Sequence, residues 1–105
     1  AVQSARRLRL RTELGLALAF DIHVQNGGVS SAAREEIKRQ LTQHPVDTEL
    51  ERRVIIANAV ADHARPQFRE DVRSRKLTIA TGTGRVHGEV FVLRNWGLAA
   101  VPLPV

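Results

Sequence analysis

A carboxylate interrupts the longest apolar stretch of this sequence, LALAFDIHVQNGG at residues 16–28. On a helix that carboxylate, Asp21, emerges on or beside the apolar stripe, since Leu14 and Leu18 lie seven and three positions before it. Burying a carboxylate without a positive partner costs several kcal/mol. Asp21 is therefore predicted either to tie two helices together or to contact a ligand. Its candidate partners are arginines of later segments: Arg53, Arg73 and Arg75.

His23 and Asn26 follow at the end of the same segment. They lie three positions apart and so share a face of the last helical turn, beside Gly27 and Gly28. Such a polar edge could line a cleft, but helix ends are polar in most proteins, so the solvated end of a helix is the favoured interpretation. Asn58, inside the apolar stretch VIIANAVA, is predicted to be a core amide whose hydrogen bonds are satisfied.

Metal, thiol and phosphate chemistry find little support in the residue spacing. The histidines include no i, i+4 pair, HExxH is absent and the chain has no cysteine, so no metal site, thiol nucleophile or cofactor is predicted. TGTGRVHG at 81–88 lacks the Lys-Ser/Thr ending of a phosphate loop and follows a predicted helix, so it is interpreted as a turn. The serine-hydrolase signature Gly-x-Ser-x-Gly is also missing. The histidines are His23, His44, His63 and His87.

Length and composition indicate one domain. The 105 residues are 43% hydrophobic and 26% charged, which is enough apolar material for a core. No apolar run approaches the roughly 20 residues of a membrane-spanning helix, so no membrane span is predicted. The start AVQSARRLRLRTEL has neither a Met nor the pattern of a secretion signal, and we expect the chain to be part of a longer polypeptide.

The positive charge is concentrated at the beginning of the chain. Of the net charge of +5, residues 1–12 carry +4 and no acid. Such an arm could meet phosphates or an anionic surface such as a bacterial wall, or it could be a solvated first turn or a helix that contacts another protein segment. Nucleic-acid binding is a weaker interpretation, because aromatic residues are few and Phe20 and Phe68 are expected on core faces. The arm's cations are Arg6, Arg7, Arg9 and Arg11.

Apolar periodicity predicts a long first helix and a shorter second one. The first should span about residues 4–26, from a Ser4 cap to Gly27-Gly28, and its second half is so apolar that neighbours should enclose it on most sides. The second should span about 31–43, ended by His44-Pro45. The stripe of the first helix consists of Leu8, Leu10, Leu14, Leu18 and Ile22.

Two further helices complete an all-α bundle of about four helices around the central apolar one. The third should run from a cap at Asp47 or Thr48 to near Arg65, and the fourth from Pro66 to Gly82. A short strand or extended tail is expected over residues 89–94. The inward side chains should be Leu50, Val54, Ala57, Ala61 and Ala64 on the third helix, and Phe68, Val72 and Ile79 on the fourth.

These features resemble the C-terminal lobe of chitosanase-type glycoside hydrolases, which belong to the lysozyme-like superfamily and are helical around a polysaccharide cleft. The resemblance rests on the Phe20-Asp21 step in a long apolar helix, the Asn26-Gly27 ending, and the arginine-bearing helix after residues 57–64. RKLTIATGTGRVHGEVFVLRNWGL also resembles the closing segment of bacterial and phage-like proteins that carry peptidoglycan-binding modules. The resemblance covers most of the chain.

The resemblance also implies what the chain lacks. Glycosidases of this superfamily use two acidic residues that flank the scissile bond, and in chitosanases both lie upstream of the matched region. The chain is therefore expected to lack the catalytic pair, and Glu13, Asp21 and Glu89 are not assigned to it.

The leading hypothesis is one wall of the cleft of a glycoside hydrolase that acts on peptidoglycan or chitosan, outside the cell or directed to the cell wall. The alternatives are a non-catalytic wall-binding or interaction module that uses its arginine arm and, less favoured, a nucleic-acid-binding domain. The substrate-binding residues would be His23, Asn26, His87 and Trp96, the last by stacking on a sugar ring. The polar residues with a structural role would be Asp21, Arg53 and Arg75.

Overall fold

The computed structural model describes residues 2–86 and 89–92, and in this part of the chain five α-helices build the fold. A helical bundle is what the apolar periodicity predicts, and the all-α prediction is confirmed. The elements are α1 (Val2–Arg7), α2 (Glu13–Asn26), α3 (Ser31–Gln43), α4 (Glu49–Asp62), the 3-10 turn η1 (Pro66–Phe68), α5 (Arg69–Thr81), β1 (Thr83–Val86) and β2 (Glu89–Val92).

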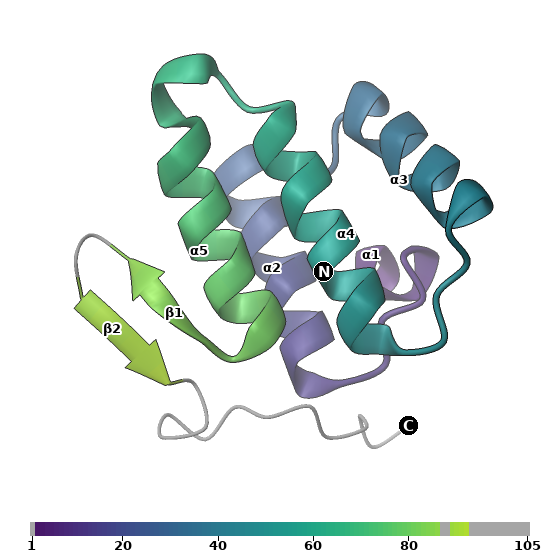
Figure 1. Ribbon diagram of the computed structural model, residues 1–105, viewed down its shortest axis with the longest axis horizontal. Helices are drawn as coiled ribbons and strands as arrows, with labels where there is room; N and C mark the ends of the chain where they lie inside the picture. The colour runs from purple at the N-terminus through teal and green to yellow at the C-terminus, as the bar shows by residue number, and fades with distance from the viewer. Residues whose placement is uncertain (1, 87–88, 93–105) are drawn as a thin grey trace.

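Three helices form the centre of the bundle. α2, α4 and α5 pack against one another, with α2 behind the other two in Figure 1. α1 packs on α2, whereas α3 packs chiefly on α4 and lies at the edge of the molecule (Figure 1). The strands β1 and β2 form an antiparallel hairpin beside α5, with Thr83 opposite Val92 and Val86 opposite Glu89. The hairpin agrees with the short strand expected near residue 89.

The prediction of a single long helix over residues 4–26 is wrong, because a turn separates α1 from α2. Arg9 has a φ of 58°, and Leu10 N–H turns back to donate to the carbonyl of Ala5 at 2.8 Å. The α2 helix starts anew at Thr12, whose hydroxyl accepts from the amide of Gly15 at 3.0 Å. The apolar spacing alone could not reveal this break, because Leu10 and Leu14 are both buried and lie four positions apart, as they would in one continuous helix.

Most helix ends agree with the sequence prediction. Ser30 caps α3 by accepting from Ala33 N–H at 3.1 Å, and α3 has the predicted bounds. Of the two caps proposed for the third helix, Thr48 is the one that accepts a helical amide, although α4 ends at Asp62 rather than near residue 65. Gly27 and Gly82 end α2 and α5 with φ of 71° and 87°, in the left-handed region that favours glycine.

The core contains the expected leucine stripe but not the two phenylalanines. Phe20 is 57% exposed because it lies two positions after Leu18, on the opposite face of α2, so this helix is less enclosed than predicted. Phe68 is 52% exposed because it belongs to η1, outside the periodicity of α5. Leu50, in the first turn of α4, is also exposed. The buried hydrophobic residues include Leu10, Leu14, Leu18, Ile22, Ile56, Ala57, Ala61 and Ala80.

None of the helices in the described ranges has the length and apolar character needed to cross a bilayer. The phosphate-loop alternative for TGTGRVHG also lacks the required order of elements. Residues 83–86 form a strand that comes directly after a helix, whereas a phosphate loop joins a strand to a following helix.

Candidate functional site

Asp21 ties α2 to α5 through two cations. Its Oδ1 accepts from Arg75 Nε at 2.8 Å and lies 2.7 Å from Arg75 Nη2, and its Oδ2 accepts from Lys76 Nζ. Asp21 is only 6% exposed and Lys76 only 1%. These contacts are those of a carboxylate that joins two helices, which is one of the two roles that the sequence left open.

The other two arginines proposed as partners do not contact Asp21. Arg73 bonds instead to α4, where it donates to Asn58 Oδ1 at 2.8 Å and pairs with Asp62. The Asn58 side-chain oxygen thus has a hydrogen-bond partner, although the residue is half-buried and not in the core as predicted. Arg75, by contrast, was proposed as a partner and is one. Arg73 and Arg75 lie two positions apart on α5, so they point to different neighbours.

The pKa values of the Asp21 cluster are set by burial and pairing. Burial alone would raise the pKa of the Asp21 carboxyl, but the hydrogen bonds and positive charges of Arg75 and Lys76 outweigh it and lower that pKa below its ordinary value. Burial lowers the pKa of the Lys76 ammonium, an effect that Asp21 only partly offsets. The hydrogen bond to Asp21 raises the pKa of Arg75.

A groove of about 670 Å³ lies directly over this cluster. We call it the α2–α5 groove. Arg75 and Lys76 belong to the lining of the groove and also bond to Asp21. The buried cluster of Asp21, Arg75 and Lys76 therefore holds this part of the lining in place. The remaining lining comes from the end of α2 (Gln25, Asn26), the connection from α4 into η1 (His63, Ala64, Arg65, Phe68) and the first turn of α5 (Asp71, Val72).

The side chains of the α2–α5 groove suit a polar ligand with an apolar face. Phe68 offers an exposed aromatic ring, and the amides of Gln25 and Asn26 can both donate and accept hydrogen bonds. Arg65 adds a cation that can bind a carboxylate with two hydrogen bonds. A few polar groups beside an apolar surface are typical of small-ligand sites.

Among the described residues that line the groove, carboxylates are few. Asp71 is the one carboxylate among its lining residues in the described part of the chain, apart from Asp21 beneath the floor, which is occupied by two cations. Glycoside hydrolysis requires two carboxyl groups facing the scissile bond. The His63 ring, which also lines the groove, is engaged by a residue outside the lining: its Nε2 lies 2.8 Å from Glu36 Oε1. The arrangement can therefore bind and orient a ligand.

The structure brings together only some of the residues singled out in the sequence. Asn26 and Arg75 both line the α2–α5 groove. His23 lies exposed on the last turn of α2 and is not among the lining residues. His87 and Trp96 lie outside the described residues.

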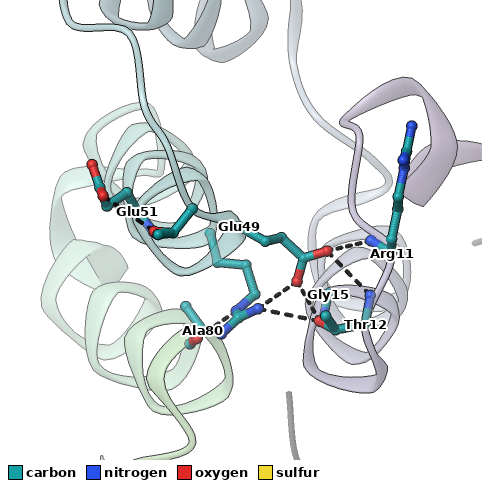
Figure 2. Close-up of polar contacts among 8 residues, drawn as sticks. Arg11, Thr12, Gly15, Glu49, Glu51 and Ala80 are labelled. Carbon is teal, nitrogen blue, oxygen red and sulfur yellow. Dashed lines mark hydrogen bonds and ion pairs between the residues drawn. The ribbon is translucent and has the colours of Figure 1, made fainter. Parts of the chain in front are cut away.

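A separate polar cluster lies around Glu49 and Thr12 at the start of α2 (Figure 2), and Arg53 belongs to it. Its Nε donates to the carbonyl of Ala80 at 2.7 Å, and its Nη1 donates to Glu49 and to Thr12. The carboxylate of Glu49 also accepts from the amides of Arg11 and Thr12 and from the Thr12 hydroxyl. Arg53 thus has the structural role that the sequence predicted, but with Glu49 rather than Asp21 as its partner.

The Glu49 cluster also explains why α1 and α2 are separate helices. Its carboxylate accepts amides that would bond within a helix if the chain were continuous there. Burial would raise the pKa of Glu49, but its hydrogen bonds with Thr12, the Arg11 amide and Arg53 lower it.

Sequence reasoning missed Lys76 and Phe68. Lys76 lies four positions after Val72 and three before Ile79, the two residues predicted to face inward, so its place on the buried face could have been read from the sequence. Phe68 is predicted to lie in the core only if residues 66–68 are helical, whereas they form the 3-10 turn before α5.

Among the described residues, no group of three or more His, Cys, Asp or Glu side chains is arranged to hold a metal ion. Comparison of the chain with protein-family models, curated proteins and solved structures finds no match.

Proposed function

We propose that this chain is a lobe of a glycoside hydrolase that acts on an amino-sugar polymer of the bacterial cell wall. In this proposal the α2–α5 groove forms one side of the substrate cleft. The observation that carries the proposal is that Asn26 and Phe68 line one groove together with Arg75 and Lys76, the two partners of Asp21. The sequence resemblance to chitosanase-type hydrolases supports the same assignment.

The chemistry of the groove matches that of an amino sugar. A pyranose ring has an apolar face that can lie on an aromatic ring such as Phe68. The acetamido group of the sugar can exchange hydrogen bonds with the amides of Gln25 and Asn26, which come from the same end of α2. The groove supplies both kinds of contact from adjoining elements.

Charge favours peptidoglycan over chitosan as the polymer. The stem peptides of peptidoglycan carry free carboxylates, which Arg65 can bind. Chitosan is polycationic when its amines are protonated, and a chain of net charge +5 repels such a polymer. The catalytic carboxylate pair would be supplied by a region of the protein upstream of Ala1, as the resemblance implies.

A sedimentation assay with insoluble peptidoglycan tests the groove. Phe68→Ala should weaken binding about fivefold, corresponding to about 1 kcal/mol for one aromatic contact. Asn26→Ala should also weaken binding, because an acetamido partner is lost. Phe20→Ala is the matched control, since Phe20 is equally exposed but lies outside the groove, and Gln43→Ala is the control for the amide.

The same assay separates the proposal from its alternative. If both groove variants bind the wall like the parent while binding falls steeply with added salt, the chain is a basic wall-binding module and the cleft assignment is wrong. The chain alone should release no reducing sugar from peptidoglycan, because the proposal assigns the acid pair to another region of the protein.

A further inference from the structure

A second groove, of about 410 Å³, lies between the end of α1 and the face of α3 that carries Ile37 and Leu41. We call it the basic groove. It shares no residue with the α2–α5 groove. Its apolar residues are Leu8, Ile37, Leu41, Pro45 and Val46, and its charged residues are Arg7, Arg9, Arg34, Lys38 and Arg52.

The lining of the basic groove carries five cations and no carboxylate. Within the described ranges, none of these five side chains forms an ion pair, whereas Arg53, Arg73 and Arg75 all pair with carboxylates. Uncompensated positive charge around a concave surface attracts an anionic partner.

The apolar and basic residues of α3 run in parallel rows. Ile37 and Leu41 are four positions apart, as are Arg34 and Lys38, so each pair forms a row along the helix axis. Arg7 and Arg9 come from the end of α1 and from the turn that follows it. The groove therefore has an apolar floor, since Ile37 is buried and Leu8 and Leu41 are half-buried, and its cations are contributed by separate elements.

We propose that the basic groove binds an acidic amphipathic helix of a partner protein. Such a helix would lay an apolar stripe on Leu41 and Leu8 and turn its carboxylates toward the cations of α1 and α3, the helix-in-groove mode of recognition. A nucleic acid would leave the apolar floor unused, and the lining contains no aromatic side chain on which bases could stack. This inference does not depend on the hydrolase proposal.

Fluorescence anisotropy with a synthetic helical peptide tests the proposal. The probe carries leucines at i, i+3, i+4 and i+7 with glutamates on both flanks, and a scrambled peptide of the same composition keeps the charge but not the stripe. The amphipathic probe should bind at least about tenfold more tightly than the scrambled one.

Neighbouring residues of α3 provide the matched variants. Lys38→Glu should weaken binding of the amphipathic probe about tenfold, because it places a like charge in the groove. Arg39→Glu makes the same charge change one residue away, at a side chain that is 60% exposed and does not line the groove, and it should have a much smaller effect. Circular dichroism checks that both variants fold.

Three results would overturn the proposal. They are equal affinity for the two peptides, equal loss of affinity in the two variants, and tighter binding of a short DNA duplex than of the amphipathic probe. The first two would reduce the groove to diffuse positive charge, and the third would assign it to nucleic acid.

Discussion

Lys76 is a buried ammonium whose neutralising partner is Asp21. Replacing Asp21 by Asn would leave that charge in the core without its carboxylate. Breaking a buried pair in this way typically costs about 3–5 kcal/mol. We therefore expect Asp21→Asn to lower the free energy of unfolding by about that amount, measured by urea denaturation.

The double variant Asp21→Asn, Lys76→Met is the control. It removes the buried charge together with its partner, and an apolar side chain of similar length occupies the space, so most of the lost stability should return. A double variant as unstable as the single one would show that the pairing is not the cause.

Acid should destabilise the fold through two carboxylates. The pKa values of Asp21 and Glu49 are lowered in the folded state from ordinary values of 3.8 and 4.5. The unfolded chain therefore takes up protons first as the pH falls. The stabilisation is fully present above these ordinary values and is lost as the pH falls through the lowered folded values. Urea denaturation at about pH 6 and about pH 3 should show the loss.

The Asp21→Asn, Lys76→Met variant should lose less stability over the same pH interval, because one of the two carboxylates is gone. A pH dependence identical to that of the parent would mean that Asp21 titrates alike in the folded and unfolded chains.

At the residue scale, the sequence predicts that Asp21 needs a cation but not which cation it has. Its position on the apolar stripe is enough for the first conclusion. The second depends on how α2 and α5 are rotated against each other, which selects Arg75 and Lys76 and turns Arg73 toward α4. That rotation is set by packing across the whole bundle.

Gly15 allows the close approach of the α1–α2 turn to the start of α2. A Cβ at this position would lie 2.8 Å from Leu10 Cβ and within 3.3 Å of both carboxylate oxygens of Glu49. Alanine normally stabilises a helix by about 1 kcal/mol relative to glycine. We expect Gly15→Ala instead to destabilise the protein by about 1–2 kcal/mol, seen as a lower Tm.

Ser74→Ala serves as the comparison for Gly15→Ala. Ser74 is exposed on α5, so alanine there should hold or slightly raise the Tm through helix propensity alone. A rise in Tm for Gly15→Ala as well would contradict the steric argument.

The α3 helix should open more readily than its neighbours. It packs chiefly on α4 and contributes only Ala33 and Ile37 to the buried set. Regions with few buried apolar contacts open at low free energy. Hydrogen–deuterium exchange should therefore label the amides of α3 before those of α4 and α5. Equal protection of α3 and α4 would contradict this expectation.

At the element scale, local signals predict helix ends well and helix continuity poorly. Ser30, Gly27 and Gly82 act on their own neighbours, and the structure confirms all three. The break before α2 depends on Glu49, which lies 37 positions after Thr12. No window of local sequence contains that contact.

On the scale of the whole molecule, the two grooves should be functionally separable. Phe68→Ala should lower peptidoglycan binding and leave the affinity for the acidic helical probe unchanged. Lys38→Glu should lower the affinity for that probe and, at moderate salt, leave peptidoglycan binding unchanged. Sedimentation and anisotropy on the same two variants provide the check. Loss of both activities in either variant would indicate a single shared surface.

The sequence anticipates the all-α architecture from the periodicity of four segments, and it singles out two residues of the groove, Asn26 and Arg75, from their places on their own helices. The rest of the α2–α5 groove joins the end of α2 to the α4–η1 connection and to α5. Only the folded bundle brings these segments together, since long-range packing rather than local pattern sets their contacts.

The ion cluster under the α2–α5 groove divides the surface into a fixed and a variable part. Arg75 and Lys76 line the groove and also bond to the buried Asp21, so a substitution at either should affect the packing of α2 against α5. Asn26, Arg65 and Phe68 are exposed. Substitutions at these rim residues should therefore change the surface of the groove without disturbing the ion cluster.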